Sequence, residues 1–226
     1  MNVLISETAA PHQRLLCAAL LLVSLFAGGA ARAAAPEPLR DGVIVFGGEA
    51  AYPPFEWLDQ GTARGSNIDI QDALAQAGGV QAEHRLADWP DVLRELESGR
   101  VDVVAMFKSP QRAERYQFSR TFEFVNHAIY GRTSSANIDS VAELRGFAVA
   151  VESRSYAHDH LLADDSGIRT VPAPNTVAAL EMVRDGRADY AILSEPAADY
   201  LVQSQRLELR RIGSPLWPTE YAFAVR

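Results

Sequence analysis

The chain has 226 residues and a formal net charge of −8 at pH 7, from 21 lysines and arginines against 29 aspartates and glutamates. This negative balance repels polyanions and argues against nucleic acid as a partner. The single cysteine, Cys17, excludes a disulfide framework within the chain and a cysteine-rich metal site.

The first 33 residues predict a secretory signal peptide. Arg14 precedes the apolar run LLCAALLLVSLFAGGA (15–30), and the small-x-small motif Ala31-Arg32-Ala33 follows it. The run is short for the roughly 20 residues that span a bilayer. Cleavage after Ala33 is therefore favoured over a retained membrane anchor, and export would place the rest of the chain in the periplasm.

The next part of the chain alternates buried-strand patterns with amphipathic helix patterns. Strands are predicted for GVIVFGG (42–48), QAEHRLA (81–87) and VDVVAM (101–106). Helices are predicted for NIDIQDALAQAGG (67–79) and for DWPDVLRELESGR (88–100), where Asp88 is a candidate N-cap.

The same order recurs further along the chain. FAVAVE (147–152) and ADYAIL (188–193) predict strands, and NTVAALEMVRDGR (175–187) predicts a helix that begins after Asn175. VLRELESGRVDVVAM aligns with ALEMVRDGRADYAIL, so that Gly99 and Gly186 suit helix C-caps and Asp102 and Asp189 open the strands. Strand–helix–strand units predict parallel sheets covered by helices, and two copies predict two lobes.

Several motifs in this order are typical of one protein family. They are AYPPFEWLDQGTARGSNIDI (51–70), DWPDVLRELESGRVDVV (88–104), SPQRAERYQFS (109–119) and IDSVAELRGFAVAVE (138–152). From about Val43 to Arg226 the chain resembles the family 3 solute-binding proteins, the amino-acid-binding, Venus-flytrap-like domains of bacterial periplasms.

The resemblance implies an α/β fold of the two-lobed, type II periplasmic-binding-protein class, in which each lobe is a mainly parallel sheet flanked by helices. Lobe one would comprise residues 34–129 and 220–226, and lobe two residues 130–219, with the ligand in the cleft between them. Family members usually continue beyond YAFAVR (221–226) with further helices, which are missing here.

In lobe one, the resemblance places Arg112 where family members bind the carboxylate of the ligand. A guanidinium matches a carboxylate with two parallel donors, and Ser109-Pro110 before it suits a helix start. Tyr52 and Trp89 match positions that line the ligand with aromatic faces. Lys108, the only lysine, is expected at the rim of the cleft.

In lobe two, the chain departs from the family pattern. Ser194 stands where amino-acid binders usually have an aspartate for the ligand ammonium, and Glu195 beside it is a possible substitute. Arg154 stands where glycine is common, and Ser155 where a hydroxyl often meets the carboxylate. These departures leave open an amino acid, a dicarboxylate or another small anion as the ligand.

The resemblance implies a binding module that needs no cofactor or metal and serves either an ABC permease or a fused or associated signalling module. Such a module could be a histidine kinase or a diguanylate cyclase. The alternative is a lyase of the cyclohexadienyl-dehydratase kind, for which Glu195 or Glu152 would be the general acid. His158 and His160, in the polar stretch HDH, are expected to be solvated.

Overall fold

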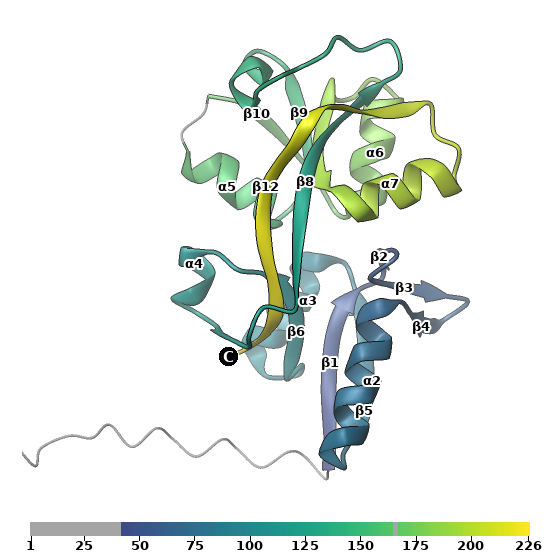
Figure 1. Ribbon diagram of the computed structural model, residues 1–226, viewed down its shortest axis with the longest axis vertical. Coiled ribbons are helices and arrows are strands. Elements are labelled where there is room, and N and C mark those ends of the chain that lie inside the picture. Colours follow the sequence, from purple (N-terminus) through teal and green to yellow (C-terminus); the bar gives the residue numbers. More distant parts are fainter. Residues whose placement is uncertain (1–41, 165–166) are drawn as a thin grey trace, which may run out of the picture. The chain divides into compact units, whose positions relative to one another are not determined.

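The computed structural model describes residues 42–164 and 167–226. Within this part, two groups of parallel strands with their helices are joined by two long antiparallel strands (Figure 1). The strand order in the large sheet is β10-β9-β11-β8-β12-β6-β1-β5, with β7 paired to β12. The predicted signal peptide, 1–33, lies outside the described residues.

The first group is built around β1 (Val43–Glu49), which pairs in parallel with β5 (Gln81–Ala87) and β6 (Val103–Phe107). Helices α2 (Ser66–Gly78) and α3 (Trp89–Ser98) connect these strands. The predicted strands and helices of this region are confirmed, within one or two residues at their ends.

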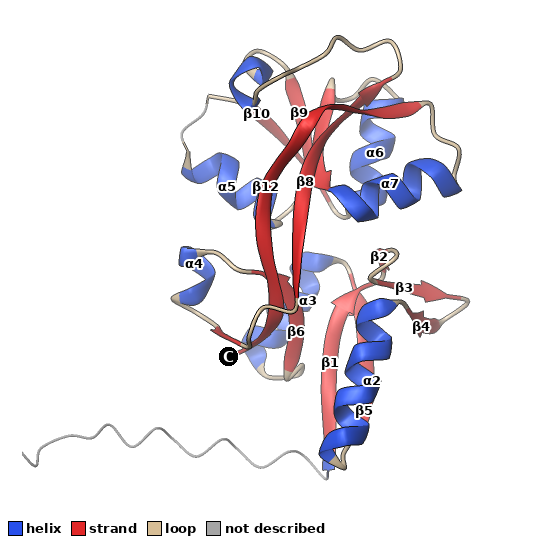
Figure 2. Cartoon of the chain, viewed as in Figure 1, coloured by secondary structure: helices blue, strands red, loops and turns tan. Residues whose placement is uncertain are grey.

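The second group repeats this plan around β9 (Ala148–Glu152), which pairs in parallel with its neighbours β10 (Arg169–Ala173) and β11 (Tyr190–Ser194). Blue helices lie beside these strands in Figure 2. They are α5 (Tyr156–Ala163), α6 (Thr176–Arg184) and α7 (Glu195–Ser204).

The two groups share the strand pair β8 (Glu123–Arg132) and β12 (Leu209–Val225), which links the upper and lower groups in Figure 1. Residues 127–131 of β8 pair with β11, and residues 221–224 of β12 pair with β6. The sequence-based limits of the lobes, 129/130 and 219/220, stay a prediction.

Shorter elements complete the fold. A separate small sheet consists of β2 (Ala51–Tyr52), β3 (Glu56–Asp59) and β4 (Thr62–Arg64). The short helix α4 (Pro110–Ala113) and strand β7 (Gln117–Phe118) follow β6. The 3-10 helix η2 (Val141–Leu144) precedes β9.

The internal repeat is confirmed by its hydrogen bonds. The Asp102 carboxylate accepts from the Val45 amide at 2.9 Å, and the Asp189 carboxylate accepts from the Ala148 amide at 2.8 Å. In each case the aspartate's own amide donates to the carbonyl of the same partner residue, at 2.8 Å. Each aspartate therefore fixes the start of the central parallel strand in its group.

The helix ends repeat as well. Gly99 and Gly186 both have φ of +73°, which glycine adopts without steric cost, and both follow helices as the sequence predicted. Asn175 caps α6, where its side chain accepts from the Ala178 amide at 2.9 Å. Asp88 is at the N-cap of α3, but its carboxylate accepts from the Asn175 Nδ2 group at 3.0 Å and caps nothing. The two helix starts are thus tied to each other.

The second group buries its sheet on both faces, which explains the continuous apolar run in β9. Ala148 and Ala150 pack in a cluster with Leu180 of α6, whereas Val149 and Val151 pack in another with Leu161 of α5. Successive residues of a strand point to opposite faces, so helices on both sides require apolar residues throughout.

Candidate functional site

A small pocket lies where the C-terminal ends of the parallel strands of both groups meet. Ligand sites in open α/β sheets commonly occupy this position. Of the residues expected at the site, five line the pocket: Tyr52, Trp89, Arg112, Ser155 and Ser194.

Arg112 contributes the guanidinium group of this pocket and is only 6% exposed. It belongs to α4, whose N-cap Ser109 accepts from the Arg112 amide at 3.1 Å, so the expected helix start is confirmed. The Nη1 group donates to the Phe107 carbonyl at 3.1 Å. Burial lowers the Arg112 pKa, and the Asp159 carboxylate opposes this change. The side chain thus presents a fixed positive charge inside the fold.

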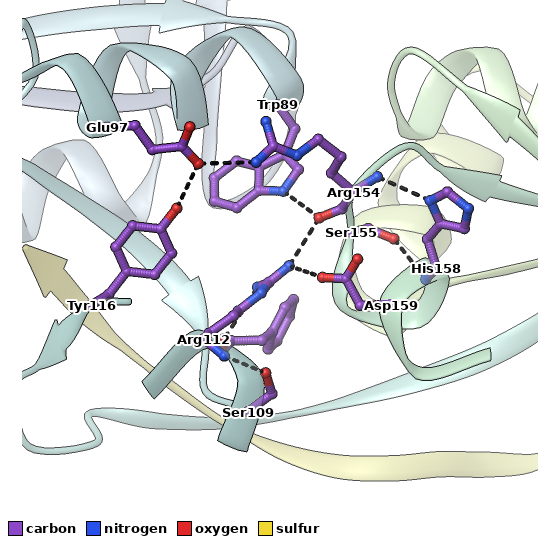
Figure 3. Close-up of polar contacts among 10 residues, drawn as sticks. Trp89, Glu97, Ser109, Arg112, Tyr116, Arg154, Ser155, His158 and Asp159 are labelled. Atoms are coloured by element: carbon purple, nitrogen blue, oxygen red, sulfur yellow. Dashed lines mark hydrogen bonds and ion pairs between the residues drawn. The ribbon is translucent and has the colours of Figure 1, made fainter. Parts of the chain in front are cut away.

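The Arg112 Nη2 group reaches across to the second group of strands (Figure 3). It donates to the Arg154 carbonyl at 3.0 Å and to the Asp159 carboxylate at 3.3 Å. The Trp89 indole N–H donates to the same Arg154 carbonyl at 2.9 Å. The Asp159 side chain is 46% exposed. It can therefore separate from Arg112 and regain hydration, whereas the guanidinium cannot.

The Arg154 side chain points away from the pocket and donates to the Glu97 carboxylate at 3.0 Å (Figure 3). Its backbone has φ of +60°, in the left-handed region. This conformation explains why glycine suits the position, and it aims the Arg154 carbonyl at Trp89 and Arg112. Its contribution at the pocket edge is that carbonyl oxygen.

Aromatic faces line the first-group side of the pocket. Tyr52 is buried and stacks on Phe55, with ring centroids 5.1 Å apart. Trp89, the first residue of α3, is buried, and its ring centroid lies 5.7 Å from the Arg112 guanidinium carbon. These rings leave the pocket apolar walls around its charged groups.

Two hydroxyl groups line the second-group side. Ser155 is the N-cap of α5, and its Oγ accepts from the His158 amide at 3.2 Å. Ser194 ends β11, is 6% exposed and has no hydrogen-bond partner for its Oγ within the described residues. The Ser194 hydroxyl lies near that of Tyr52. It can hold a ligand only by hydrogen bonding, because it carries no charge.

Lys108 and Glu195 are not among the residues that line this pocket. The Lys108 ammonium donates to the Thr121 hydroxyl at 2.8 Å and pairs with Glu220 at 3.1 Å. The Glu195 carboxylate forms an ion pair with Arg211. Both charges are thus matched by the chain itself, and their ligand roles stay predictions.

The two histidines of HDH, which were expected to be solvated, are half-buried. The His160 ring lies 4.2 Å from the Trp217 ring and 5.7 Å from that of Tyr156, between centroids. His158 accepts from the Arg154 amide at 3.1 Å. Both rings thus contact other parts of the fold and keep partial exposure to solvent.

The sequence analysis missed Glu49 and Glu56, and it named Glu152 only as a possible general acid of the alternative lyase. Glu49 ends β1 and is 7% exposed, Glu152 ends β9 and is 4% exposed, and both line the pocket. Glu56 lies behind Glu49, where it accepts from the Glu49 amide at 2.8 Å and from the Asn67 Nδ2 group at 3.0 Å. Glu49 could have been found, because VIVFGGE and AVAVE end their strands alike in the repeat.

Burial dominates the acid–base behaviour of these groups. It raises the pKa of Glu56 to about 8 and that of Glu152 to about 7, and it raises the pKa of Glu49 well above its usual range. It also lowers the pKa of His127, another lining residue, to about 3. At neutral pH the pocket therefore holds a neutral imidazole and carboxyl groups that are partly protonated.

Comparison with known proteins agrees with this architecture. The family model of bacterial extracellular solute-binding proteins, family 3, matches residues 44–212. The chain belongs to this family. Its curated relatives include the arginine-binding extracellular protein ArtP of Bacillus subtilis, 26% identical over 82% of this chain and 73% of the relative. The L-cystine-binding protein TcyJ of Escherichia coli is 26% identical over 92% of this chain and 81% of the relative.

Solved structures of solute-binding folds superpose on the chain. A histidine kinase sensor domain with similarity to periplasmic binding proteins gives a TM-score of 0.79 at 33% identity, covering 83% of this chain and 84% of that one. An ancestral arginine-binding protein bound to arginine gives 0.74 at 28% identity, covering 82% and 84%. The predicted two-lobed, type II class is thus confirmed.

Among the described residues, 42–164 and 167–226, no helix is both long and apolar enough to cross a membrane.

Proposed function

We propose that this chain is an extracytoplasmic solute-binding domain that captures a small, amino-acid-like ligand with a carboxylate group. The buried guanidinium of Arg112 is the observation that carries this proposal, because it lines the pocket and its carboxylate partner is half exposed. A ligand carboxylate would replace Asp159 on Arg112 and gain a charge-assisted hydrogen bond away from bulk water. The relatives named as amino-acid-binding proteins support this choice of ligand.

The remaining lining residues have roles that suit such a ligand. Tyr52 and Trp89 would enclose its apolar part, and the hydroxyls of Ser155 and Ser194 would bind its polar atoms. The interactions of Trp89 and Arg112 with the Arg154 carbonyl would close the pocket over it. Lys108 and Glu195 would act at most at longer range.

A thermal-shift screen of L-arginine, L-glutamine, L-glutamate, L-cystine and succinate tests this function. A ligand that binds only the native state raises the melting temperature. Arg112→Ala should weaken binding by more than about 30-fold, because it removes one partner of a buried charge pair. Arg120→Ala, which removes an exposed arginine, is the matched control and should leave affinity unchanged. Full affinity in the Arg112 variant would contradict the assignment.

Two outputs fit a domain of this kind. Relatives named as components of ABC transporters favour uptake through a permease. The similarity to a histidine kinase sensor domain, over 84% of that chain, favours sensing. Loss of ligand uptake on deletion of the gene would support the permease. Unchanged uptake with loss of a transcriptional response to the ligand would support the signalling module.

Periplasmic localisation is part of the same proposal. A fusion of residues 1–33 to a reporter that is active only after export tests the predicted signal peptide. Substitution of Ala31 and Ala33 by larger residues should block its cleavage.

We expect binding without turnover. Of the two acids considered for a lyase, Glu195 is paired with Arg211, whereas Glu152 lines the pocket. Mass spectrometry of the incubated ligand distinguishes binding from turnover, since a lyase would release a lighter product.

A further inference from the structure

Glu49 and Glu152 are equivalent residues of the internal repeat that meet in one pocket. Each is the last residue of the central parallel strand of its group, β1 or β9. Each strand is fixed at its start by an aspartate in the same way, through Asp102 or Asp189. The repeat therefore aims two carboxyl groups at the same space from opposite sides.

The two carboxyl groups lie close enough to share a hydrogen bond. Within the described part of the chain, Glu49 Oε2 and Glu152 Oε1 have no hydrogen-bond donor. Their side chains are almost fully buried, so ionisation of both without a hydrogen-bond donor would be costly. Two ionised carboxylates at this distance would repel each other in a poorly solvated site, and a single proton between them removes that repulsion.

The charged groups around the pair add further negative charge. Asp88, just before α3, repels both glutamates through its charge, and Glu56, on β3, repels Glu49. Arg112, from α4, is the cation that acts on both glutamates, and it already pairs with Asp159 from α5.

The uncharged neighbours do not supply a compensating cation. His127, on β8, stays neutral because burial lowers its pKa to about 3. The Thr176 side chain, at the start of α6, hydrogen bonds to Glu152. Tyr52, on β2, and Ser194, on β11, contribute neutral hydroxyls. The pocket therefore has an excess of negative charge when both glutamates are ionised.

The pKa values agree with this geometry. Burial, followed by the charge of Glu152, raises the pKa of Glu49 well above its usual range, and burial raises the pKa of Glu152 to about 7. The pair thus titrates as a unit and retains a proton near neutral pH.

We propose that Glu49 and Glu152 together bind the positively charged group of the ligand, an amine or a guanidinium, which displaces the proton held between them. This inference rests on the proposed function and assigns the group of the ligand that Arg112 does not bind. One positive charge leaves for the solvent as another enters, so the net charge of the site is unchanged. It also explains how the site can bind an ammonium although Ser194 replaces the usual acid.

Isothermal titration calorimetry with L-arginine in two buffers of different ionisation enthalpy measures the proton exchange. Near neutral pH we expect release of about one proton per L-arginine bound. Below the pKa of the pair, affinity should fall by about tenfold per pH unit, because protons compete with the ligand. If Arg112 is required for L-arginine binding but no proton is released, this inference fails and the proposed function stands.

Glu152→Gln separates a binding role from a structural one. The amide would donate a hydrogen bond to Glu49 and remove the repulsion, so the pKa of Glu49 would fall and fewer protons would be released than in the wild type. Glu114→Gln changes an exposed glutamate and is the matched control, with release as in the wild type. Release unchanged from that of the wild type in the Glu152 variant would overturn the proposal.

The protein without ligand provides an independent test. Carbon-13 NMR of the glutamate carboxyl groups should show one carboxyl that is still protonated near pH 6.5 and that changes in both Glu49→Gln and Glu152→Gln. Two ionised carboxylates at that pH would overturn the shared proton. Failure of L-arginine, L-glutamine and L-cystine to bind even at pH 9, where the pair is ionised, would overturn the ligand subsite and the proposed amino-acid ligand together.

Discussion

The two groups of strands share one scaffold but differ in the segment that comes after their third strand. In both, an aspartate fixes the central strand and a glutamate ends it, and a glycine follows the helix that precedes the third strand. After β6, however, the chain turns through Ser109 into α4 and presents Arg112 to the pocket. After β11 it enters α7 directly, and Glu195 pairs with Arg211 outside the pocket lining.

This difference shows where the fold carries its chemistry. The hydrogen bonds that hold the strands in register are repeated, so both groups must satisfy the same backbone requirements. The turns at the strand ends are free of that requirement and can carry different side chains. The resulting pocket has a cation from one side and half of an acidic pair from each side.

The largest expected effect tests whether the two helix faces contribute equally. Leu93 of α3 and Leu180 of α6 are equivalent in the repeat and 4% and 0% exposed. Leu93→Ala and Leu180→Ala should each lower the free energy of unfolding by about 2–5 kcal/mol, because each leaves a cavity. Urea denaturation measures both; a loss confined to one variant would show that the groups do not share one cooperative core.

The next effect concerns the aspartates that fix β1 and β9. Asp102→Ala and Asp189→Ala should each cost about 1–3 kcal/mol, because each leaves a buried amide without its acceptor. Similar losses in urea denaturation would support equal roles in the repeat. Asp185→Ala, at an exposed aspartate near the end of α6, is the control and should change stability little.

Stability should also depend on pH, with opposite contributions from the buried acids Glu56 and Glu152 and from the buried His127. The folded-state pKa of Glu56 and of Glu152 is raised, to about 8 and about 7, so their contribution to stability falls as pH rises from 4.5. The pKa of His127 is lowered to about 3, so its contribution rises from there to pH 6.5. The fall should be clearest between pH 6.5 and 8, with a slope of up to about 1.4 kcal/mol per pH unit for each acid.

Glu56→Gln and Glu152→Gln test the contribution of each acid separately in that experiment. Each variant should reduce the fall of stability above pH 6.5 in urea denaturation. An unchanged slope in both variants would mean that neither carboxyl group holds its proton in the folded protein.

The smallest effect is at Arg154, where the two groups are in contact. Its φ of +60° disfavours any residue with a Cβ, so Arg154→Gly should be about 1 kcal/mol more stable than Arg154→Ala. Both variants lose the ion pair with Glu97, so their difference isolates the backbone strain. Equal stability by urea denaturation would show that the strain is relieved locally.

Much of the fold could be predicted from the sequence because its signals are local. The apolar runs of β1, β6, β9 and β11, and glycines such as Gly99, mark strands and helix ends within a few residues. The aligned Asp102 and Asp189 predicted the repeat, and the structure adds the reason, which is their bond to the central strand. Arg112, Tyr52, Trp89, Ser155 and Ser194 were placed at the pocket by resemblance to the family.

Other features of the site depend on contacts that sequence does not reveal. The sequence did not distinguish Glu195 from Glu152 as a candidate acid. In the structure, Arg211 on the distant strand β12 forms an ion pair with Glu195 and matches its charge. The sequence showed only that Arg154 stands where glycine is common, whereas in the structure its left-handed backbone turns the carbonyl inward and the guanidinium toward Glu97.

By itself, the sequence determined the order of strands and helices, the two-fold repetition and the position of one arginine at the start of a short helix. These follow from periodicity and from backbone requirements that act over a few residues. Only the tertiary structure decided that Glu49 and Glu152 face each other and that Asp159 neutralises Arg112. Protonation and ion pairing depend on burial and on charges from distant segments, and folding alone brings these together.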